Sequence, residues 1–137
     1  MKKNIQVFII ILMLITITGC GKKTNKDNQD ISNEPIVNVE EGVTSDKDLG
    51  EGIVAQNTKM VTVNGETTIT TNVINNGDVE KYIKYVDIIL KNENGEVVKT
   101  LIGYIGQSIP SKQSYEVITS INIDLSKIKS VEYKINY

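Results

Sequence analysis

Few side chains in this sequence could carry covalent chemistry. Cys20 is the only cysteine among the 137 residues, and there is no histidine. Ser–His and Cys–His pairs are therefore excluded within this sequence, and so are most zinc sites. What remains is the thiol of Cys20 and two neighbouring Ser–Lys pairs, Ser111-Lys112 and Ser126-Lys127.

The Ser–Lys pairs and the acidic segments have simpler explanations than chemistry. Adjacent loop residues rarely reach the mutual geometry that an activated nucleophile needs. Residues 76–80 and 92–96 offer carboxylate and amide oxygens, but neither segment has the ligand spacing of an EF-hand calcium loop. Turn formation accounts for their Asn, Asp and Gly residues. We therefore expect no catalytic residue, no metal site and no cofactor, and a hydrolase is the least favoured class.

Three tyrosines are the candidate binding residues. Tyr82, Tyr85 and Tyr104 could form an exposed recognition patch, because tyrosine is enriched at interfaces. The alternative is that they are half-buried tyrosines of a sheet, with the ring packed and the hydroxyl in water.

The residues that precede Cys20 indicate export. Lys2 and Lys3 are followed by an apolar run over residues 7–17 that only Thr16 interrupts. This run is too short to cross roughly 30 Å of hydrocarbon as a helix. It matches the apolar region of a signal peptide, about 7 to 15 residues followed by small residues. Residues 1–19 are predicted to be such a signal.

The end of this segment, Ile17-Thr18-Gly19-Cys20, resembles the lipobox of bacterial lipoproteins. The family pattern is an aliphatic residue, a small residue, Gly or Ala, and then Cys, with Ile17 here in place of the commoner Leu. The resemblance implies a lipid anchor on the Cys20 thiol, with diacylglyceryl and palmitate-type chains, and peptidase cleavage between Gly19 and Cys20. Two or more acyl chains anchor a protein stably, at about 0.8 kcal/mol for each buried CH₂ group. The alternatives are an uncleaved anchor and an ordinary secreted protein with an incidental cysteine.

Residues 20–51 are predicted to be a flexible, lipid-anchored linker. They are rich in Asn, Asp, Glu, Lys, Ser and Gly, and their apolar residues are sparse. Such a segment buries too little apolar surface to offset its conformational entropy. A strand over residues 35–39 is the alternative, and disorder is preferred.

Residues 52–137 are predicted to form the folded domain. Apolar and polar residues alternate in them, and Asn-Gly pairs such as Asn64-Gly65 mark tight turns. The expected strands cover residues 53–63, 67–75, 82–91, 97–105, 115–123 and 131–137, and a single helical turn with Asp124 as N-cap is expected over 124–129. Six or seven short strands with close turns favour an all-β, antiparallel sandwich.

The segment from Thr67 to Tyr137 resembles the FxLYD-type domains of bacterial lipoproteins. The family's motif falls on residues 88–92, where Leu90 matches and Ile88, Lys91 and Asn92 replace Phe, Tyr and Asp. Pro110, Ser114 and Tyr115 fit the family's later loop and strand start. The resemblance implies an immunoglobulin-like β-sandwich without a known catalytic site, and another immunoglobulin-like adhesive or inhibitor fold is the neighbouring alternative.

Charge limits the partners that this chain can bind. The net charge is −2, and without Lys2 and Lys3 it becomes −4. A nucleic-acid partner normally requires a basic patch, so none is expected. The function predicted is a membrane-anchored, extracytoplasmic binding or scaffold module, which contacts lipid through acylated Cys20 and a protein or cell-wall polymer through the domain. The alternative is an accessory subunit of a membrane transporter or cell-wall machine.

Overall fold

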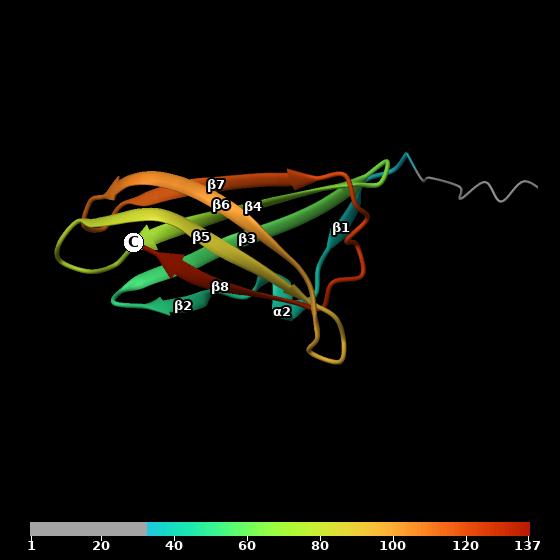
Figure 1. The fold of residues 1–137 in the computed structure, drawn as a ribbon, viewed down its shortest axis with the longest axis horizontal. Helices are drawn as coiled ribbons and strands as arrows, with labels where there is room; N and C mark the ends of the chain where they lie inside the picture. The colour runs from blue at the N-terminus through green and yellow to red at the C-terminus, as the bar shows by residue number, and fades with distance from the viewer. Residues whose placement is uncertain (1–32) are drawn as a thin grey trace, which may run out of the picture.

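Two antiparallel β-sheets pack face to face in the computed structural model, which describes residues 33–137 (Figure 1). The predicted all-β sandwich is therefore confirmed. The elements are β1 (Ile36–Asn38), α2 (Glu41–Thr44), β2 (Lys47–Gly50), β3 (Ile53–Val63), β4 (Glu66–Asn75), β5 (Lys81–Lys91), β6 (Val97–Ile109), β7 (Ser114–Ile121) and β8 (Ser130–Asn136).

Strands that follow one another in the sequence are divided between the two sheets. Sheet A has the order β1-β3-β4-β7, with β2 also paired to β3, and sheet B has the order β6-β5-β8. Strand β4 pairs with β7, while β5, which follows β4, pairs with β8 in the other sheet. The chain therefore crosses between the sheets after β4, after β6 and after β7.

Period-two alternation located the six strands of residues 53–136 correctly. In β5, Val86, Ile88 and Leu90 are fully buried, while the residues between them lie on the other face. The Asn64-Gly65 turn also forms as predicted, with positive φ at both residues. The side chains from both sheets form one apolar core, which includes Ile53, Met60, Ile69, Val73, Ile83, Val86, Ile88, Leu90, Ile109, Val117 and Val131.

The predicted boundary between linker and domain at residue 52 requires correction. Residues 36–50 form β1, α2 and β2, and both strands pair with β3. Val43 of α2 is fully buried. A β-carbon at Gly42 would lie only 2.3 Å from the carbonyl oxygen of Lys129, so α2 packs closely against the segment before β8. Residues 20–32 of the predicted linker, and the predicted signal, lie outside the described residues.

Asn38 fastens this N-terminal segment to the sandwich. Its buried amide nitrogen donates to the carbonyl of Ile128 (2.8 Å), and its amide oxygen accepts from the backbone N–H of Glu40 (3.0 Å). The segment thus gains a polar anchor in Asn38 and an apolar one in Val43. These few buried contacts offset the entropy that its polar composition predicted would keep it disordered.

The helical turn predicted over residues 124–129 does not form. The Asp124 carboxylate does accept a hydrogen bond from the backbone N–H of Ser126 (2.9 Å), as an N-cap would. The following residues form turns instead, and bury Leu125 and Ile128 in the core. The local hydrogen bond is thus an Asx-type turn, which uses the same donor and acceptor without a helix.

A β-bulge in β3 keeps the core-facing side chains of both halves of the strand directed inward. Ile53 and Ala55 point inward, and so do Met60 and Thr62, although the two pairs differ in parity. The register with β4 shifts between Gln56 and Lys59, where Asn57 has φ +54°. Without this extra residue, the second half of β3 would turn its apolar side chains to solvent.

Asn75 connects the loops at the far end of the sandwich. Its side chain is fully buried and donates to the carbonyls of Val79 (2.7 Å) and Ile109 (2.9 Å). Its amide oxygen accepts from the backbone N–H of Gly77 (3.0 Å). One amide therefore pairs the backbone groups of two crossings between the sheets.

The corrected domain boundary can be tested with two truncated chains. We expect a fragment of residues 33–137 to unfold cooperatively, and a fragment of residues 52–137 to be less stable by at least about 3 kcal/mol, because it loses buried Val43 and the hydrogen bonds of Asn38. Urea denaturation followed by circular dichroism measures this difference. Equal stability of the two fragments would show that residues 33–51 are not part of the domain.

We expect Asn75→Ala to destabilise the domain by about 2–4 kcal/mol, because it leaves buried backbone groups in two loops without partners. Asn72→Ala is the matched control: Asn72 lies on the same strand, with its side chain on the outer face, and should change stability by less than about 0.5 kcal/mol. Chemical denaturation compares the two variants with the parent chain. Similar losses for both would contradict the role given to Asn75.

Candidate functional site

The three tyrosines predicted from the sequence lie on one surface, the outer face of sheet B. Tyr85 on β5 and Tyr104 on β6 are direct cross-strand partners, and Tyr82 precedes Tyr85 on β5, opposite Ser108. Tyr82 is 52% exposed and Tyr104 is 68% exposed, while Tyr85 is partly buried. We call the surface formed by Tyr82, Tyr85, Ile102 and Tyr104 the tyrosine face.

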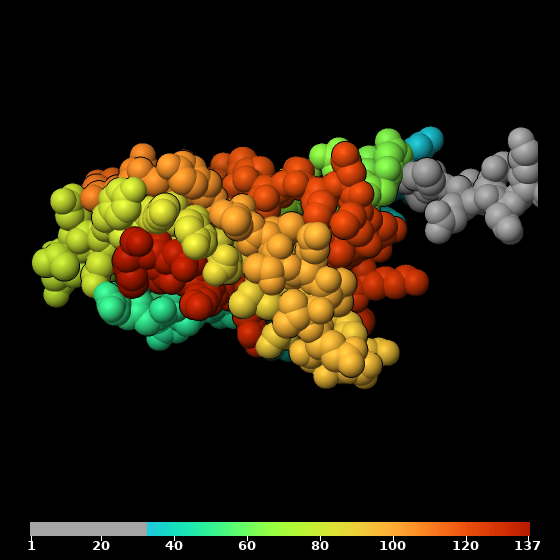
Figure 2. Space-filling view, in the orientation of Figure 1, coloured from blue at the N-terminus to red at the C-terminus, as the bar shows by residue number. Residues whose placement is uncertain are grey.

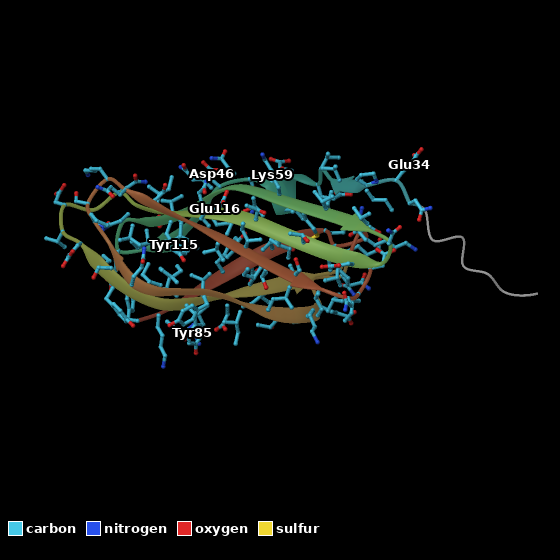
Figure 3. All side chains as sticks on the ribbon, turned by 90° about the horizontal axis from the view of Figure 1, so that it is seen from above. Glu34, Asp46, Lys59, Tyr85, Tyr115 and Glu116 are labelled. Atoms are coloured by element: carbon cyan, nitrogen blue, oxygen red, sulfur yellow. The ribbon has the colours of Figure 1, made fainter. Side chains whose placement is uncertain are left out.

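This face is open to solvent within the described part of the chain. Figure 2 views the sandwich from the side of sheet B, and atoms of β5, β6 and β8 lie at the surface there. Figure 3 shows Tyr85 pointing away from the sandwich, on the side opposite Lys59 and Glu116 of sheet A. The three tyrosines are therefore placed where a ligand could reach them.

A register irregularity between β5 and β6 makes the tyrosine face possible. The pairing of β5 with β6 shifts between Ile83 and Tyr85. Ile83 and Val86 both stay fully buried on either side of this shift, although they are three residues apart. Two residue steps of β5 face three steps of β6, from Gln107 to Tyr104, so the extra residue lies in β6. With this irregularity, Tyr82 and Tyr85 both lie on the outer face while the core remains continuous.

The Tyr104 ring packs against the backbone of Gly106, which we call the seat of the ring. Gly106 has φ +66°, which favours glycine, and lies within the irregularity of β6. A β-carbon there would lie 2.4 Å from the Tyr104 hydroxyl oxygen and 2.5–2.7 Å from two of its ring carbons. The ring thus lies along the strand over the bare backbone of Gly106. This contact was missed from the sequence, where Gly103 and Gly106 indicated only a bend or bulge.

The charges beside the tyrosine face are largely paired. Asp87 lies opposite Lys134 of β8 and accepts a hydrogen bond from the Asn136 amide (3.1 Å). Lys91 forms an ion pair with Glu132. Ile102, on β6 opposite Asp87, is 60% exposed. The surface is therefore apolar along β6 and becomes polar but nearly neutral towards β8.

The two Ser–Lys pairs contact other parts of the backbone. The Ser111 hydroxyl donates to the carbonyl of Gly77 (2.7 Å), and the Lys112 ammonium group donates to the carbonyl of Asn76 and pairs with Asp78 (3.2 Å). At the other pair, the backbone N–H of Ser126 donates to the Asp124 carboxylate and so closes the turn there. These contacts fix loops.

The acidic segments also form turns. The Asn92 side chain accepts hydrogen bonds from the backbone N–H groups of Asn94 and Glu96, both at 3.0 Å. Within residues 33–137, no three side chains of His, Cys, Asp or Glu converge as they would around a metal ion.

Two shallow clefts lie beside the loop between β7 and β8. One of about 430 Å³ is lined by Asn92, Glu93, Ser126, Lys127 and Lys129, and a neighbouring one of about 300 Å³ shares Asn92 and Lys127 with it. Glu40 pairs with Lys129 and raises the pKa of its ammonium group through a hydrogen bond. Hydrogen bonds from Ser126 lower the pKa of nearby Asp124. The acidic and basic side chains around these clefts thus largely cancel in charge, so the clefts attract an anion only weakly.

A buried hydroxyl cluster joins the two sheets, and the sequence analysis did not predict it. The Thr58 hydroxyl lies 3.0 Å from that of Thr71 and 2.8 Å from that of Tyr133. Burial raises the pKa of Tyr133, so its phenol stays protonated well above neutral pH. The hydrogen bonds of the cluster run between hydroxyl groups and to the carbonyl of Gln56, and they join β3 and β4 to β8.

Gly19 and Cys20, the predicted cleavage and lipidation site, lie outside the described residues. No helix within residues 33–137 is long and apolar enough to cross a membrane. No protein-family model matches the chain, and no curated protein or solved structure is significantly similar to it. The resemblances to the lipobox and to FxLYD-type domains therefore stay predictions.

The hydroxyl cluster predicts a dependence of stability on alkaline pH. Because burial raises the pKa of Tyr133 above its unfolded value of about 10, its contribution to stability is present below pH 10 and is lost as the pH rises through the folded pKa. We expect Tyr133→Phe to cost about 1 kcal/mol at pH 8 and to weaken this alkaline decline.

Urea denaturation at pH 8 and pH 11 measures both effects. Tyr82→Phe is the control, because Tyr82 is exposed and lies outside the hydroxyl cluster, and it should leave the alkaline decline unchanged. An unchanged alkaline decline in Tyr133→Phe would remove Tyr133 as its source.

Proposed function

We propose that this chain is an extracytoplasmic lipoprotein, held on the cell membrane through acylated Cys20, whose β-sandwich is a non-catalytic binding module. The observation that carries the proposal is the segment Ile17-Thr18-Gly19-Cys20, placed directly after a short apolar run with lysines before it. Two or more acyl chains on one cysteine suffice for stable anchoring without a spanning helix.

The position of the tyrosine face supports the binding role. The chain enters the domain beside β1, whose Ile36 pairs with Thr62 near the Asn64-Gly65 turn, and the C-terminus lies at the opposite end (Figure 1). Tyr82 lies near the start of β5, next to Lys81, which pairs with Glu51 at that far end. A domain anchored through its N-terminal side would hold this face away from the membrane.

The corrected domain boundary limits how far the domain could extend. With the first strand at Ile36, the covalent chain from Cys20 spans at most about 55 Å when fully extended. The linker predicted from the sequence ran to residue 51 and would have reached further. The module would therefore sample a thin layer outside the membrane.

An immunoglobulin-like assignment of the sandwich is part of this proposal. Its support is the interlocking of β4 with β7 and of β5 with β8 across two antiparallel sheets, an arrangement familiar from Greek-key sandwiches. It agrees with the FxLYD-type resemblance in class, and implies recognition through a sheet face or loops.

The accessory-subunit alternative has support in the exposed apolar residues of the tyrosine face. Ile102 and Tyr104 are both more than half exposed on the edge strand β6, which pairs only with β5 among the described strands. A photo-crosslinker placed at Ile102 in intact cells would separate the two roles. One protein captured in near-equal amount indicates an accessory subunit, whereas wall fragments indicate a free-standing module.

The anchor is tested with Cys20→Ala. We expect this variant to lose acylation and cleavage at Gly19-Cys20 and to leave the detergent phase of a membrane extract, because the only thiol that can carry the lipid is gone. Thr18→Ala, which keeps a small residue before Gly19, is the control and should be processed normally. Mass spectrometry of the N-terminus reads the result, and a lipid-modified, cleaved Cys20→Ala protein would overturn the anchor.

A further inference from the structure

We infer that the tyrosine face is a stacking platform for an uncharged polysaccharide strand. The inference rests on the proposed binding role of this face and names its ligand class. Three observations carry it: the flat seat of Tyr104, the spacing of the three rings and the charge balance around them.

The Tyr104 ring is held in place before any ligand binds. It lies over the backbone of Gly106, at a position where a single added carbon would collide with it, and the residue is 68% exposed. One face of the ring is thus covered by the strand, and the other is free. The free face of an aromatic ring is electron-rich and attracts the polarised C–H groups on the apolar face of a sugar ring. Because the ring is already ordered, stacking costs little conformational entropy.

The other two tyrosines extend the platform along the strands. Tyr85 is the cross-strand partner of Tyr104, so their β-carbons lie about 5 Å apart. Tyr82 lies three residues before Tyr85, which corresponds to about 10 Å along β5. The three rings thus form a corner, with Tyr85 and Tyr104 side by side across two strands and Tyr82 further along β5. A linear polysaccharide offers flat ring faces at regular intervals, so one sugar could stack on the Tyr85–Tyr104 pair and a later one on Tyr82. Hydroxyls at the ring edges could reach polar side chains next to the rings, such as Asp87 and Asn136.

The charge of the face complements a neutral ligand. Asp87 faces Lys134 and Glu132 pairs with Lys91, so these acids and bases cancel, and exposed Lys84 adds one positive charge. A nucleic acid or another polyanion would find no basic field here. A protein partner usually places an anchor side chain in a pocket. The two clefts beside the β7–β8 loop lie away from the tyrosine face. A smaller cleft lies on sheet A and is lined by Val61, Val63, Glu66 and Thr68.

The test measures binding of the full chain, extracted in detergent, to two uncharged hexasaccharides: β-1,4-linked N-acetylglucosamine and β-1,4-linked glucose. Tyrosine fluorescence reports binding without labels, because the chain has six tyrosines and no tryptophan. We expect at least one hexasaccharide to bind. Tyr104→Ala and Tyr85→Ala should each weaken binding at least about tenfold, as for the loss of a stacked ring.

Two control variants separate the loss of a stacked ring from the loss of a hydroxyl group and from the loss of an exposed apolar side chain elsewhere. Tyr104→Phe keeps the ring and should bind within about threefold of the parent chain. Ile118→Ala removes an apolar side chain that is 61% exposed on β7 of sheet A, and should leave binding unchanged.

Gly106→Ala tests the seat itself. It keeps Tyr104 but pushes its ring off the strand, so binding should fall about as far as in Tyr104→Ala. Gly95→Ala is its matched control, since Gly95 also has a positive φ (+77°) but nothing lies within 4 Å of its added carbon. Both variants carry a similar backbone strain, and only the first should lose the ligand. Circular dichroism confirms that each variant is folded.

Other outcomes overturn the inference. If the parent chain binds neither hexasaccharide at millimolar concentration, or if Tyr104→Ala binds as the parent does, the platform is not a polysaccharide site. A protein captured through Ile102 together with no sugar binding would assign the face to a protein partner. The anchor is independent of this result, because Cys20→Ala tests it separately. If the chain binds sugar but is not lipidated, the polysaccharide site stands and the membrane anchor is overturned.

Discussion

The peptide groups at the crossings between the two sheets must be hydrogen-bonded once they are buried, and the rest of this fold depends on that constraint. A strand satisfies its own backbone by pairing, but the chain between sheets has no strand neighbour. Asn75 supplies the partners for the crossings after β4 and β6. The Thr67 hydroxyl does the same after β7, where it donates to the carbonyl of Ile123 and accepts from the N–H of Leu125. No buried side-chain nitrogen or oxygen in residues 33–137 lacks a partner. With these groups satisfied, sheet faces rich in Ile and Val can close on each other.

The same constraint explains why irregular strands produce a regular core and a usable surface. Each sheet must keep its apolar side chains inward over ten or more residues while it twists, and the chain accomplishes this with extra residues at Asn57 in β3 and between Tyr104 and Gln107 in β6. The second irregularity includes Gly106, whose positive φ and missing side chain give the Tyr104 ring its place. The most exposed aromatic residue of the domain is therefore positioned by a feature that the core requires. This couples the candidate site to the rigid part of the fold.

The sequence predicted what depends on local pattern and missed what depends on distant contacts. Alternation along β5 placed Val86, Ile88 and Leu90 inside and Tyr85 outside, because the side-chain period of a strand is fixed. Strand β2 was missed and β1 was considered only as an alternative to disorder, because their sparse apolar residues become significant only when Asn38 meets Ile128, 90 positions later. The Asp124 hydrogen bond was expected correctly, but burial of Leu125 and Ile128 decided against a helix. For the site, the sequence identified the three tyrosines, whereas the seat on Gly106 could not be predicted, since it requires the conformation of the backbone and the direction of the ring.

The point where the chain enters the domain and the proposed binding face are separated, and their separation has a physical consequence. The N-terminal segment is fixed at one end through Asn38 and through the ion pair of Glu40 with Lys129, close to the end of β5. Tyr85 lies six residues before the end of that strand, about 20 Å away along it. Because β5 pairs with β8 without a register shift from Tyr85 to Lys91, motion of the predicted linker would turn the domain as a body and leave the geometry of the face unchanged. Such an arrangement suits a module that searches a thin layer above a membrane: the linker would supply the range of orientations, and the sandwich would supply a surface that is already in its binding conformation.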